Sequence, residues 1–104
     1  MERKKVVYIA GPITGVAKYW EPFERAEDEI LAKGWVPLSP AHHPVGLTNE
    51  AYTRLNMAMI DVADAVLFLR NSTRSKGALL EYQYCKYINK PTAHTIEGLK
   101  GVLG

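Results

Sequence analysis

The sequence predicts an α/β fold in which a parallel sheet is wrapped by helices. The first observation is that apolar, strand-like runs alternate along the chain with segments of helical periodicity. The second is that the clearest run, AVLFL at residues 65–69, is apolar without interruption, as is typical of a strand buried on both faces. The chain of 104 residues is long enough for one core and contains no repeat or linker, so we expect a single domain over residues 1–104.

The first part of the chain predicts two strands around one helix. Residues 5–10 (KVVYIA) are a short β-branched run, and residues 35–38 (WVPL) are a second strand in which Pro37 argues for an edge position. Between them we expect a helix from about residue 19 to 33, ended by Gly34 as a C-terminal cap. Its apolar positions at helical spacing are Phe23, Ala26 and Ile30.

The middle of the chain predicts a loop and a second helix. Residues 39–48 are rich in Pro, His and Gly and should form the loop. The helix is expected to cover Asn49 to about Ala63 and to lead into the strand at 65–69. Its inner face is marked by Tyr52, Leu55, Met59 and Val62.

The last part of the chain predicts one further helix and one short strand. Residues 70–76 (RNSTRSK) are a polar loop, residues 75–89 are a helix, and residues 91–95 are a short fourth strand. Residues 96–104 contain three glycines and little pattern, which leaves a frayed helix and a partner contact as alternatives.

Right-handed crossovers make 2-1-3-4 the economical strand order. This is the order of a flavodoxin-like or Rossmann-like three-layer sandwich, with a sheet of four to five strands. Ligands bind such sheets outside the carboxyl ends of the strands, at the switch point between the first and third strands. The loops at that place are residues 11–15 and 70–76.

Glu81 is the candidate for chemistry. On a helix of about 100° per residue, Gln83, Lys86 and Lys90 share the side that faces water. A carboxylate on the opposite, apolar side is costly to bury without a partner, while a position near the helix start favours its negative charge. A cap on a neighbouring backbone or a pair with a buried cation is the structural alternative. The predicted inner side carries Gly77, Ala78, Glu81, Tyr84, Cys85 and Ile88.

Two loops are candidates for binding an anion. Gly11-Pro12-Ile13-Thr14-Gly15 offers close backbone approach and a hydroxyl, which suits a phosphate or a sugar, and a structural turn is equally open. The loop is neither a dinucleotide fingerprint nor a Walker A motif. Ser75-Lys76-Gly77 joins backbone donors, a hydroxyl and a cation at a helix start, where the alternative is an ordinary Ser cap.

Composition and charge exclude several classes of function. A net charge of +2 is too small for a nucleic-acid surface, and no apolar run approaches a membrane span or a signal peptide. The single Cys85 suits a reducing compartment, so we expect a cytoplasmic protein. His42, His43 and His94 have no metal-ligand spacing with Cys85, and we expect no metal site. Asp61 and Asp64 precede the third strand, far from the crevice, and are interpreted as helix-end and turn residues.

At three of these segments the chain resembles the nucleoside 2-deoxyribosyltransferase family, including its relatives that hydrolyse nucleoside 5′-monophosphates. The segments are YIAGPITG at residues 8–15, ADA at 63–65 and SKGALLE at 75–81. The resemblance covers most of the chain and is greatest to the short phage and bacterial members.

The resemblance implies an N-glycosidase or deoxyribosyltransferase in which Glu81 is the nucleophile and Tyr8 orients it. The glutamate forms a covalent glycosyl-enzyme that a second base or water resolves. The resemblance implies a small nucleoside or nucleotide substrate, no metal or organic cofactor, and a homodimer or larger homo-oligomer in which a neighbouring chain completes the site. The residues expected to bind the substrate are Gly11, Pro12, Ile13, Thr14, Gly15, Asn56, Ser75, Lys76 and Gly77.

Positions 75 and 56 refine this expectation. At position 75, family members that use nucleosides tend to carry an acid, whereas the monophosphate hydrolases carry Ser. Ser75 beside Lys76 therefore favours a 5′-phosphorylated substrate. Asn56 stands where the family carries an Asp close to the leaving base. An amide cannot act as an acid at neutral pH, which favours the alternative function, a nucleotide-binding module that senses or sequesters its ligand without cleaving it.

Overall fold

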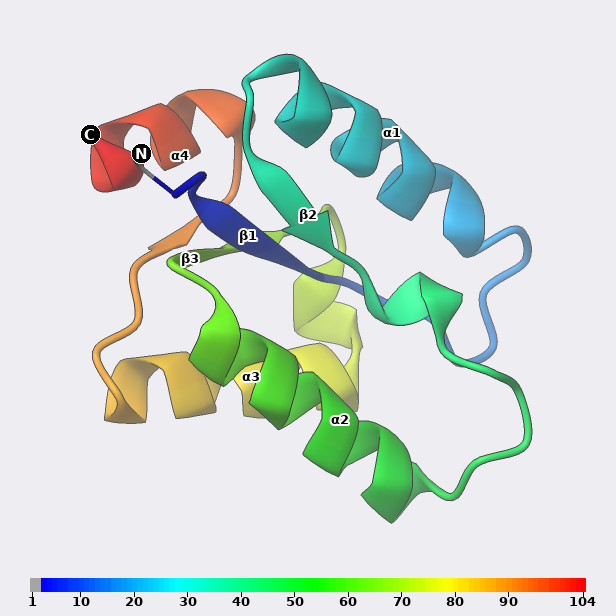
Figure 1. Ribbon diagram of the computed structural model, residues 1–104. Helices are drawn as coiled ribbons and strands as arrows, with labels where there is room; N and C mark the ends of the chain where they lie inside the picture. The colour runs from blue at the N-terminus through cyan, green and yellow to red at the C-terminus, as the bar shows by residue number, and fades with distance from the viewer. Residues whose placement is uncertain (1–2) are drawn as a thin grey trace.

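A four-stranded parallel sheet of order β2-β1-β3-β4 forms the centre of the protein in the computed structural model, which describes residues 3–104 (Figure 1). The register pairs Tyr8 with Leu38 on one side and with Val66 on the other, so β1 lies inside the sheet. This is the predicted strand order, and β2 is the predicted edge strand. The strands are β1 (Val6–Ala10), β2 (Val36–Leu38), β3 (Ala65–Phe68) and β4 (Thr92–Ala93).

Two helices cover each face of the sheet (Figure 1). The helices α1 (Trp20–Ala32) and α4 (Ile96–Leu103) lie on one face, and α2 (Asn49–Val62) and α3 (Lys76–Tyr87) lie on the other. Short 3₁₀ turns at Pro40–His42 and Ser72–Arg74 interrupt the two loops that sequence predicted. The side chains of Thr48, Ser75 and Thr95 cap α2, α3 and α4 by accepting backbone N–H groups.

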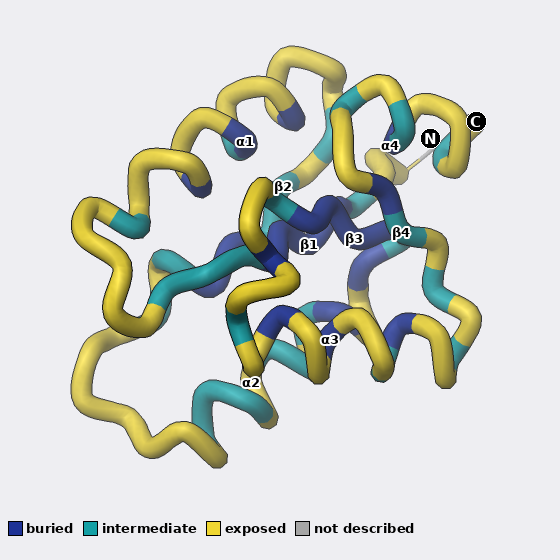
Figure 2. The backbone as a smooth tube through the Cα atoms, turned by 180° about the vertical axis from the view of Figure 1, so that it is seen from behind, coloured by how far each residue is buried: buried dark blue, intermediate teal, exposed yellow. Residues whose placement is uncertain are grey.

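The sheet separates two apolar cores. In Figure 2 the buried residues lie mainly in β1, β3 and the inward stripes of the helices, while most of the loops are exposed or intermediate. The core beneath α1 and α4 contains Phe23, Ile30 and Leu99. The core beneath α2 and α3 contains Tyr8, Ile60 and Cys85. The phenol of Tyr8 is therefore a polar group placed inside an apolar core, where it needs a partner.

The C-terminal segment forms the helix α4, which is one of the two predicted alternatives. Thr95 Oγ1 accepts the N–H of Gly98, and Leu99 is completely buried. Gly98 lies so close to β4 that an added Cβ would stand 3.2 Å from the Cβ of Ala93. The glycines that weakened the helical pattern in the sequence thus include one that lets α4 pack closely on the sheet.

The predicted inner face of α2 is partly wrong. Leu55 is 41% and Val62 is 66% exposed, whereas Ile60 is fully buried and Asn56 is directed inward to α3. Apolar residues lie on both sides of this helix, so periodicity alone could not fix its rotation about its own axis. Packing against β1 and α3 decides it.

The predicted faces of α3 need two corrections. Gly77 is exposed rather than inward, and Lys90, placed on the water side, is half-buried. Lys90 Nζ donates hydrogen bonds to the backbone carbonyls of Asp61 and Ala63. Lys90 follows the end of the helix, so its direction is set by the turn before β4 and not by helical periodicity.

Asp64 fastens the amino edge of the sheet. Its carboxylate accepts the backbone N–H of Val6 at 2.7 Å and two hydrogen bonds from the Arg3 guanidinium at 2.6 and 2.8 Å. The Arg3 hydrogen bond, with smaller help from Val6, lowers the pKa of Asp64 to about 2. Asp61 accepts a hydrogen bond from the Tyr84 hydroxyl at 2.6 Å. Both aspartates therefore bond within the scaffold, as the sequence predicted.

We predict that Asp64→Asn lowers the unfolding free energy by roughly 1 kcal/mol at pH 7, because a charge-assisted hydrogen bond at a half-exposed site is lost. A lowered pKa means that the folded state binds protons less tightly. The contribution of Asp64 to the unfolding free energy is therefore present above about pH 4 and disappears as the pH falls through 2. Urea denaturation across this range measures it, with Asp28→Asn on the exposed side of α1 as the matched control. An unchanged midpoint for Asp64→Asn at pH 7 would contradict the assignment.

Candidate functional site

A buried carboxylate with two hydrogen-bond donors lies between the sheet and two helices. Glu81 on α3 is 6% exposed. The Tyr8 hydroxyl on β1 donates to Glu81 Oε2 at 3.1 Å, and Asn56 Nδ2 on α2 donates to the same oxygen at 3.2 Å. The three residues come from positions 8, 56 and 81, so only the fold brings them together.

The two carboxylate oxygens of Glu81 have different surroundings. Within residues 3–104 no hydrogen bond reaches Oε1. In the same part of the chain no fully buried side-chain polar atom lacks a partner. Oε1 is therefore not sealed off and retains access to solvent. One oxygen is held by two donors, and the other accepts no hydrogen bond from the described residues.

Local sequence explains why each side chain points to this place. Ala78, Glu81 and Cys85 form the buried stripe of α3, with spacings of three and four residues. Tyr8 is one of the β1 residues that face α2 and α3, in the same core as Ala10. Asn56 precedes the buried Ile60 by one helical turn. Asn56 and Glu81 each interrupt the apolar side of their helix at positions that face one another, and this brings the two side chains into contact.

Burial controls the protonation of this cluster. Desolvation raises the pKa of Glu81 to about 7, while the hydrogen bonds from Tyr8 and Asn56 oppose the rise. Desolvation, together with the negative charge of Glu81, raises the pKa of the Tyr8 phenol far above its ordinary value, so Tyr8 remains a donor. The sequence-based expectation that the helix start keeps Glu81 ionised is wrong. Since α3 begins at Lys76, Glu81 lies in the second turn, beyond the free N–H groups.

His43 extends the cluster to a residue that sequence analysis did not connect with it. Its Nε2 lies 2.8 Å from Asn56 Oδ1. Because Asn56 donates Nδ2 to Glu81, its Oδ1 is the acceptor, and His43 donates. The histidines were considered only as metal ligands. The available signal was the position of His43 in a loop that follows the edge strand and so ends above the carboxyl edge of the sheet.

Two glycines of the 11–15 loop are required by the backbone conformation and packing of the loop. A Cβ on Gly11 would stand 3.0 Å from Leu69, so glycine permits close packing at the ends of β1 and β3. Gly15 has a φ of +75°, a value that favours glycine. Pro12 and Ile13 are half-buried, and Thr14 is exposed. The structural turn therefore accounts for Gly11 and Gly15, and ligand contact by this loop stays a prediction.

The 75–77 segment forms the N-terminal cap and first turn of α3. Ser75 Oγ accepts the N–H of Ala78 at 3.1 Å, while Lys76 and Gly77 are exposed in the first turn. No hydrogen bond joins this segment or the 11–15 loop to Glu81 within the described residues 3–104. The structure thus brings Tyr8, Asn56 and Glu81 into contact, and a phosphate contact at Ser75 stays a prediction.

Comparison with known proteins places the chain in a family. A model described as "Domain of unknown function (DUF4406)" matches residues 5–93. The chain belongs to the DUF4406 family. A search of curated proteins finds no significant match.

The fold of this DUF4406 domain is similar to that of a solved "2-desoxiribosyltransferase from Leishmania mexicana". The TM-score is 0.69 and the sequence identity 24%, over 85% of this chain and 61% of that one. The DUF4406 chain therefore spans about three-fifths of the length of the solved protein. Both have the deoxyribosyltransferase-like, Rossmann-type arrangement of the sheet and helices.

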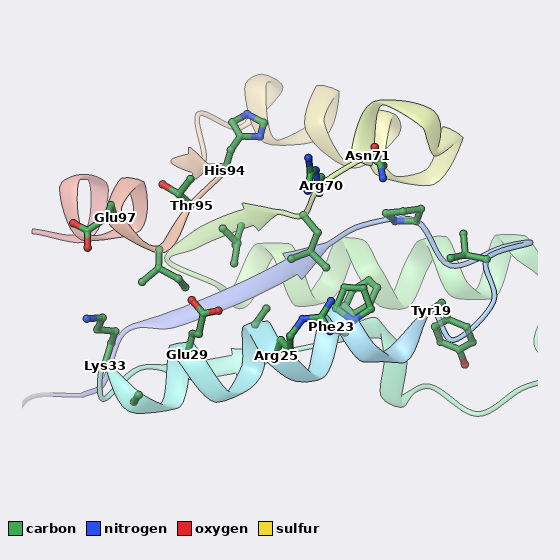
Figure 3. A pocket seen from close by; sticks show the side chains of 18 residues that line it. Tyr19, Phe23, Arg25, Glu29, Lys33, Arg70, Asn71, His94, Thr95 and Glu97 are labelled. Atoms are coloured by element: carbon green, nitrogen blue, oxygen red, sulfur yellow. The ribbon is translucent and has the colours of Figure 1, made fainter.

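A separate groove of about 860 Å³ lies on the face of the sheet away from Glu81. Figure 3 shows Arg25, Glu29 and Lys33 projecting from α1, and Glu97 from α4, around an apolar floor. Leu67 and Leu69 contribute to this floor. The groove shares neither Tyr8, Asn56 nor Glu81, so its size says nothing about the carboxylate site.

Two further observations concern the described part of the DUF4406 chain. Residues 3–104 contain no group of three or more His, Cys, Asp or Glu side chains arranged to hold a metal ion. None of the helices there is both long and apolar enough to cross a membrane.

We predict that the stability of the DUF4406 domain falls as the pH rises from about 4.5 to 7 and that Glu81→Gln removes this dependence. The raised pKa of Glu81 means that the folded state binds a proton more tightly, so the stabilisation is complete below the ordinary value and is lost as the pH rises through 7. Between pH 4 and pH 8 the wild type should lose on the order of 2–3 kcal/mol of unfolding free energy that Glu81→Gln does not lose. Denaturation at both pH values measures this, with Glu24→Gln on α1 as the exposed control. Parallel curves for wild type and Glu81→Gln would show that Glu81 ionises as freely as a surface glutamate.

Proposed function

We propose that this DUF4406 protein is an N-glycosidase or deoxyribosyltransferase-type enzyme that cleaves the N-glycosidic bond of a nucleoside 5′-monophosphate or a related nucleotide. The observation that carries the proposal is the asymmetric environment of Glu81. Tyr8 and Asn56 hold Oε2, and within residues 3–104 Oε1 accepts no hydrogen bond. A nucleophilic carboxylate needs such fixed orientation together with one oxygen open to the reacting carbon.

In the first step Oε1 of ionised Glu81 attacks the anomeric carbon of the sugar. The new C–O bond forms as the C–N bond breaks. The electron pair of the C–N bond leaves with the base nitrogen, which takes a proton from water. In the second step water attacks the same carbon, the Glu81–sugar bond breaks, and the carboxylate is regenerated with release of one proton. A second base in place of water gives transfer instead of hydrolysis.

The hydrogen bonds around Glu81 favour its role as nucleophile over a role as acid. The donors on Oε2 lower the pKa of a carboxyl group that burial would otherwise keep protonated at neutral pH. Tyr8 is too weak an acid to protonate the leaving base, and Asn56 cannot do so. The reaction therefore relies on orientation and on the ionised carboxylate, and it requires no metal or organic cofactor.

Charge supports a phosphorylated substrate. Lys76 is exposed at the amino end of α3, next to the hydroxyl of Ser75 and the backbone N–H groups of the first turn. This is a favourable environment for a phosphate dianion. The Leishmania mexicana protein of similar fold is named for transfer of a deoxyribosyl group, which agrees with a sugar as part of the substrate.

The proposal includes a homodimer or larger homo-oligomer. The exposed Leu55 and Val62 lie one above the other on the outer side of α2, and an apolar stripe of this kind is typical of a helix that packs against a partner. Light scattering of the purified protein gives its mass in solution, and a monomer at every concentration would remove this part of the proposal.

The alternative function is a nucleotide-binding module that senses or sequesters its ligand. Asn56 is the observation that favours it, because the side chain nearest to Glu81 on α2 supplies no proton to a leaving base. Binding of a nucleotide without release of its base separates the two functions.

We predict release of free base from at least one member of a panel of ribo- and deoxyribonucleoside monophosphates, detected by chromatography. Glu81→Gln should lower kcat by about 10³-fold or more, because the amide is not a nucleophile, and Tyr8→Phe by roughly 10- to 100-fold, because one donor to Oε2 is lost. Glu24→Gln is the control for an exposed glutamate. Nucleotide binding by wild type and Glu81→Gln with no base released by either would establish the binding module instead.

Position 75 gives a second prediction, on substrate class. Asn and Asp cap a helix about as well as Ser, so Ser75→Asn and Ser75→Asp should both retain α3. The negative charge of Asp repels a 5′-phosphate, and we expect Ser75→Asp to raise KM for the monophosphate roughly tenfold relative to Ser75→Asn. The unphosphorylated nucleoside serves as the control substrate. Equal KM values for both variants with the monophosphate would place the phosphate elsewhere.

A further inference from the structure

The loop between β2 and α2 carries His43 into hydrogen-bond contact with the carboxylate cluster. His43 Nε2 lies 2.8 Å from Asn56 Oδ1, and Asn56 Nδ2 lies 3.2 Å from Glu81 Oε2. The adjacent His42 has a different environment, since its side chain is 70% exposed and its Nε2 faces Glu27 on α1. Only the second histidine of the pair is connected to Glu81.

Tyr52 holds this loop in place. Its hydroxyl donates to the carbonyl of Pro44 at 2.7 Å and accepts the N–H of Leu47 at 3.2 Å. The rings of Tyr52 and His43 lie 6.2 Å apart at an interplanar angle of 32°. At the other end of the loop, Ser39 is buried and its Oγ accepts the N–H of Ala41. His43 is therefore anchored on both sides and meets Asn56 as a fixed donor.

The amide of Asn56 couples the hydrogen bond of His43 to that of Glu81. It has one acceptor end and one donor end, so it can satisfy the pair in two ways. In the observed arrangement His43 donates to Oδ1 and Nδ2 donates to Glu81 Oε2, which suits an ionised carboxylate. In the reversed arrangement Oδ1 would face Oε2, which is acceptable only if Glu81 is protonated and His43 Nε2 carries no hydrogen.

We propose that His43 is a positioning residue that acts through Asn56 to hold Glu81 in its ionised, attacking state. The N–H of His43 fixes the amide with its donor end toward Glu81 and so disfavours the reversed arrangement that accompanies a neutral carboxyl group. The role of Glu81 as nucleophile rests on the proposed function, whereas the coupling of the three side chains does not.

The other groups that face Glu81 do not titrate near neutral pH. From β1 it faces the phenol of Tyr8, whose pKa is raised far above the ordinary value. From α3 it faces the thiol of Cys85, whose pKa burial raises to about 11. From α2 it faces the uncharged Asn56. Around His43 the neighbouring ring is Tyr52. A change in the titration of Glu81 between wild type and a His43 variant thus reports on the hydrogen bond that His43 makes to Asn56.

The experiment is an NMR titration of the Glu81 side-chain carboxyl carbon in protein labelled at glutamate Cδ, with Glu81→Gln used to assign the signal. We expect His43→Phe, which keeps an aromatic ring against Tyr52 but removes the N–H, to raise the proton affinity of Glu81 by threefold to tenfold. His43→Gln, whose amide can donate to Asn56, should restore most of the wild-type value. His42→Phe, the matched control, should titrate as wild type does.

Base release provides a second readout if the enzyme is active. We expect the acidic limb of the pH profile of kcat/KM to move to higher pH in His43→Phe by the same amount as the Glu81 titration, with the high-pH plateau within about twofold of wild type. Identical Glu81 titrations in wild type and His43→Phe, or the same shift in His42→Phe, overturn the proposal. Absence of base release in all variants contradicts the proposed function alone, because the titration does not depend on turnover.

Discussion

The arrangement of this molecule depends on a single buried carboxylate. Glu81 lies in the core between β1, α2 and α3, and a charge at such a place is tolerated only with polar partners. Tyr8 and Asn56 supply them from two other elements. Each of these groups would be costly to bury alone, and together they form a satisfied network that fixes how α2 and α3 sit on the sheet. Desolvation still raises the pKa of Glu81 to about 7, so the network holds a group that can change charge near neutrality.

Two carboxylates next to the sheet have contrasting surroundings. At the amino edge Asp64 is bonded to Arg3 and to the backbone of Val6, an arrangement in which every acceptor has a donor and the pKa is low. On the face covered by α2 and α3, Glu81 has one oxygen that accepts two hydrogen bonds and one that accepts none from residues 3–104, and its pKa is raised to about 7. Two carboxylates in one small domain thus differ in charge state because of their surroundings. Such a difference is typical of a division between scaffold and reactive groups.

This DUF4406 domain has a fold that also occurs in a deoxyribosyltransferase, and it spans about three-fifths of that protein's length. In this domain the loop between β2 and α2 contacts Asn56 through His43 and is bonded to α2 by Tyr52. Side chains from β1, α2 and this loop thus lie in one hydrogen-bonded cluster with Glu81. The groove beneath α1 and α4 is independent of that cluster, because the sheet lies between them.

The sequence by itself determined the α/β class, the strand order 2-1-3-4, the bounds of most elements and the inward position of Glu81. These follow from local periodicity, chain connectivity and a charge placed within an apolar pattern. Tyr8 and Asn56 entered the sequence-based site through a resemblance, and their contact with Glu81 required the fold. Tertiary structure alone decided the rotation of α2, the burial that raises the pKa of Glu81, and the approach of His43. These depend on packing between residues far apart in the chain, and no local pattern encodes the distance between positions 43, 56 and 81.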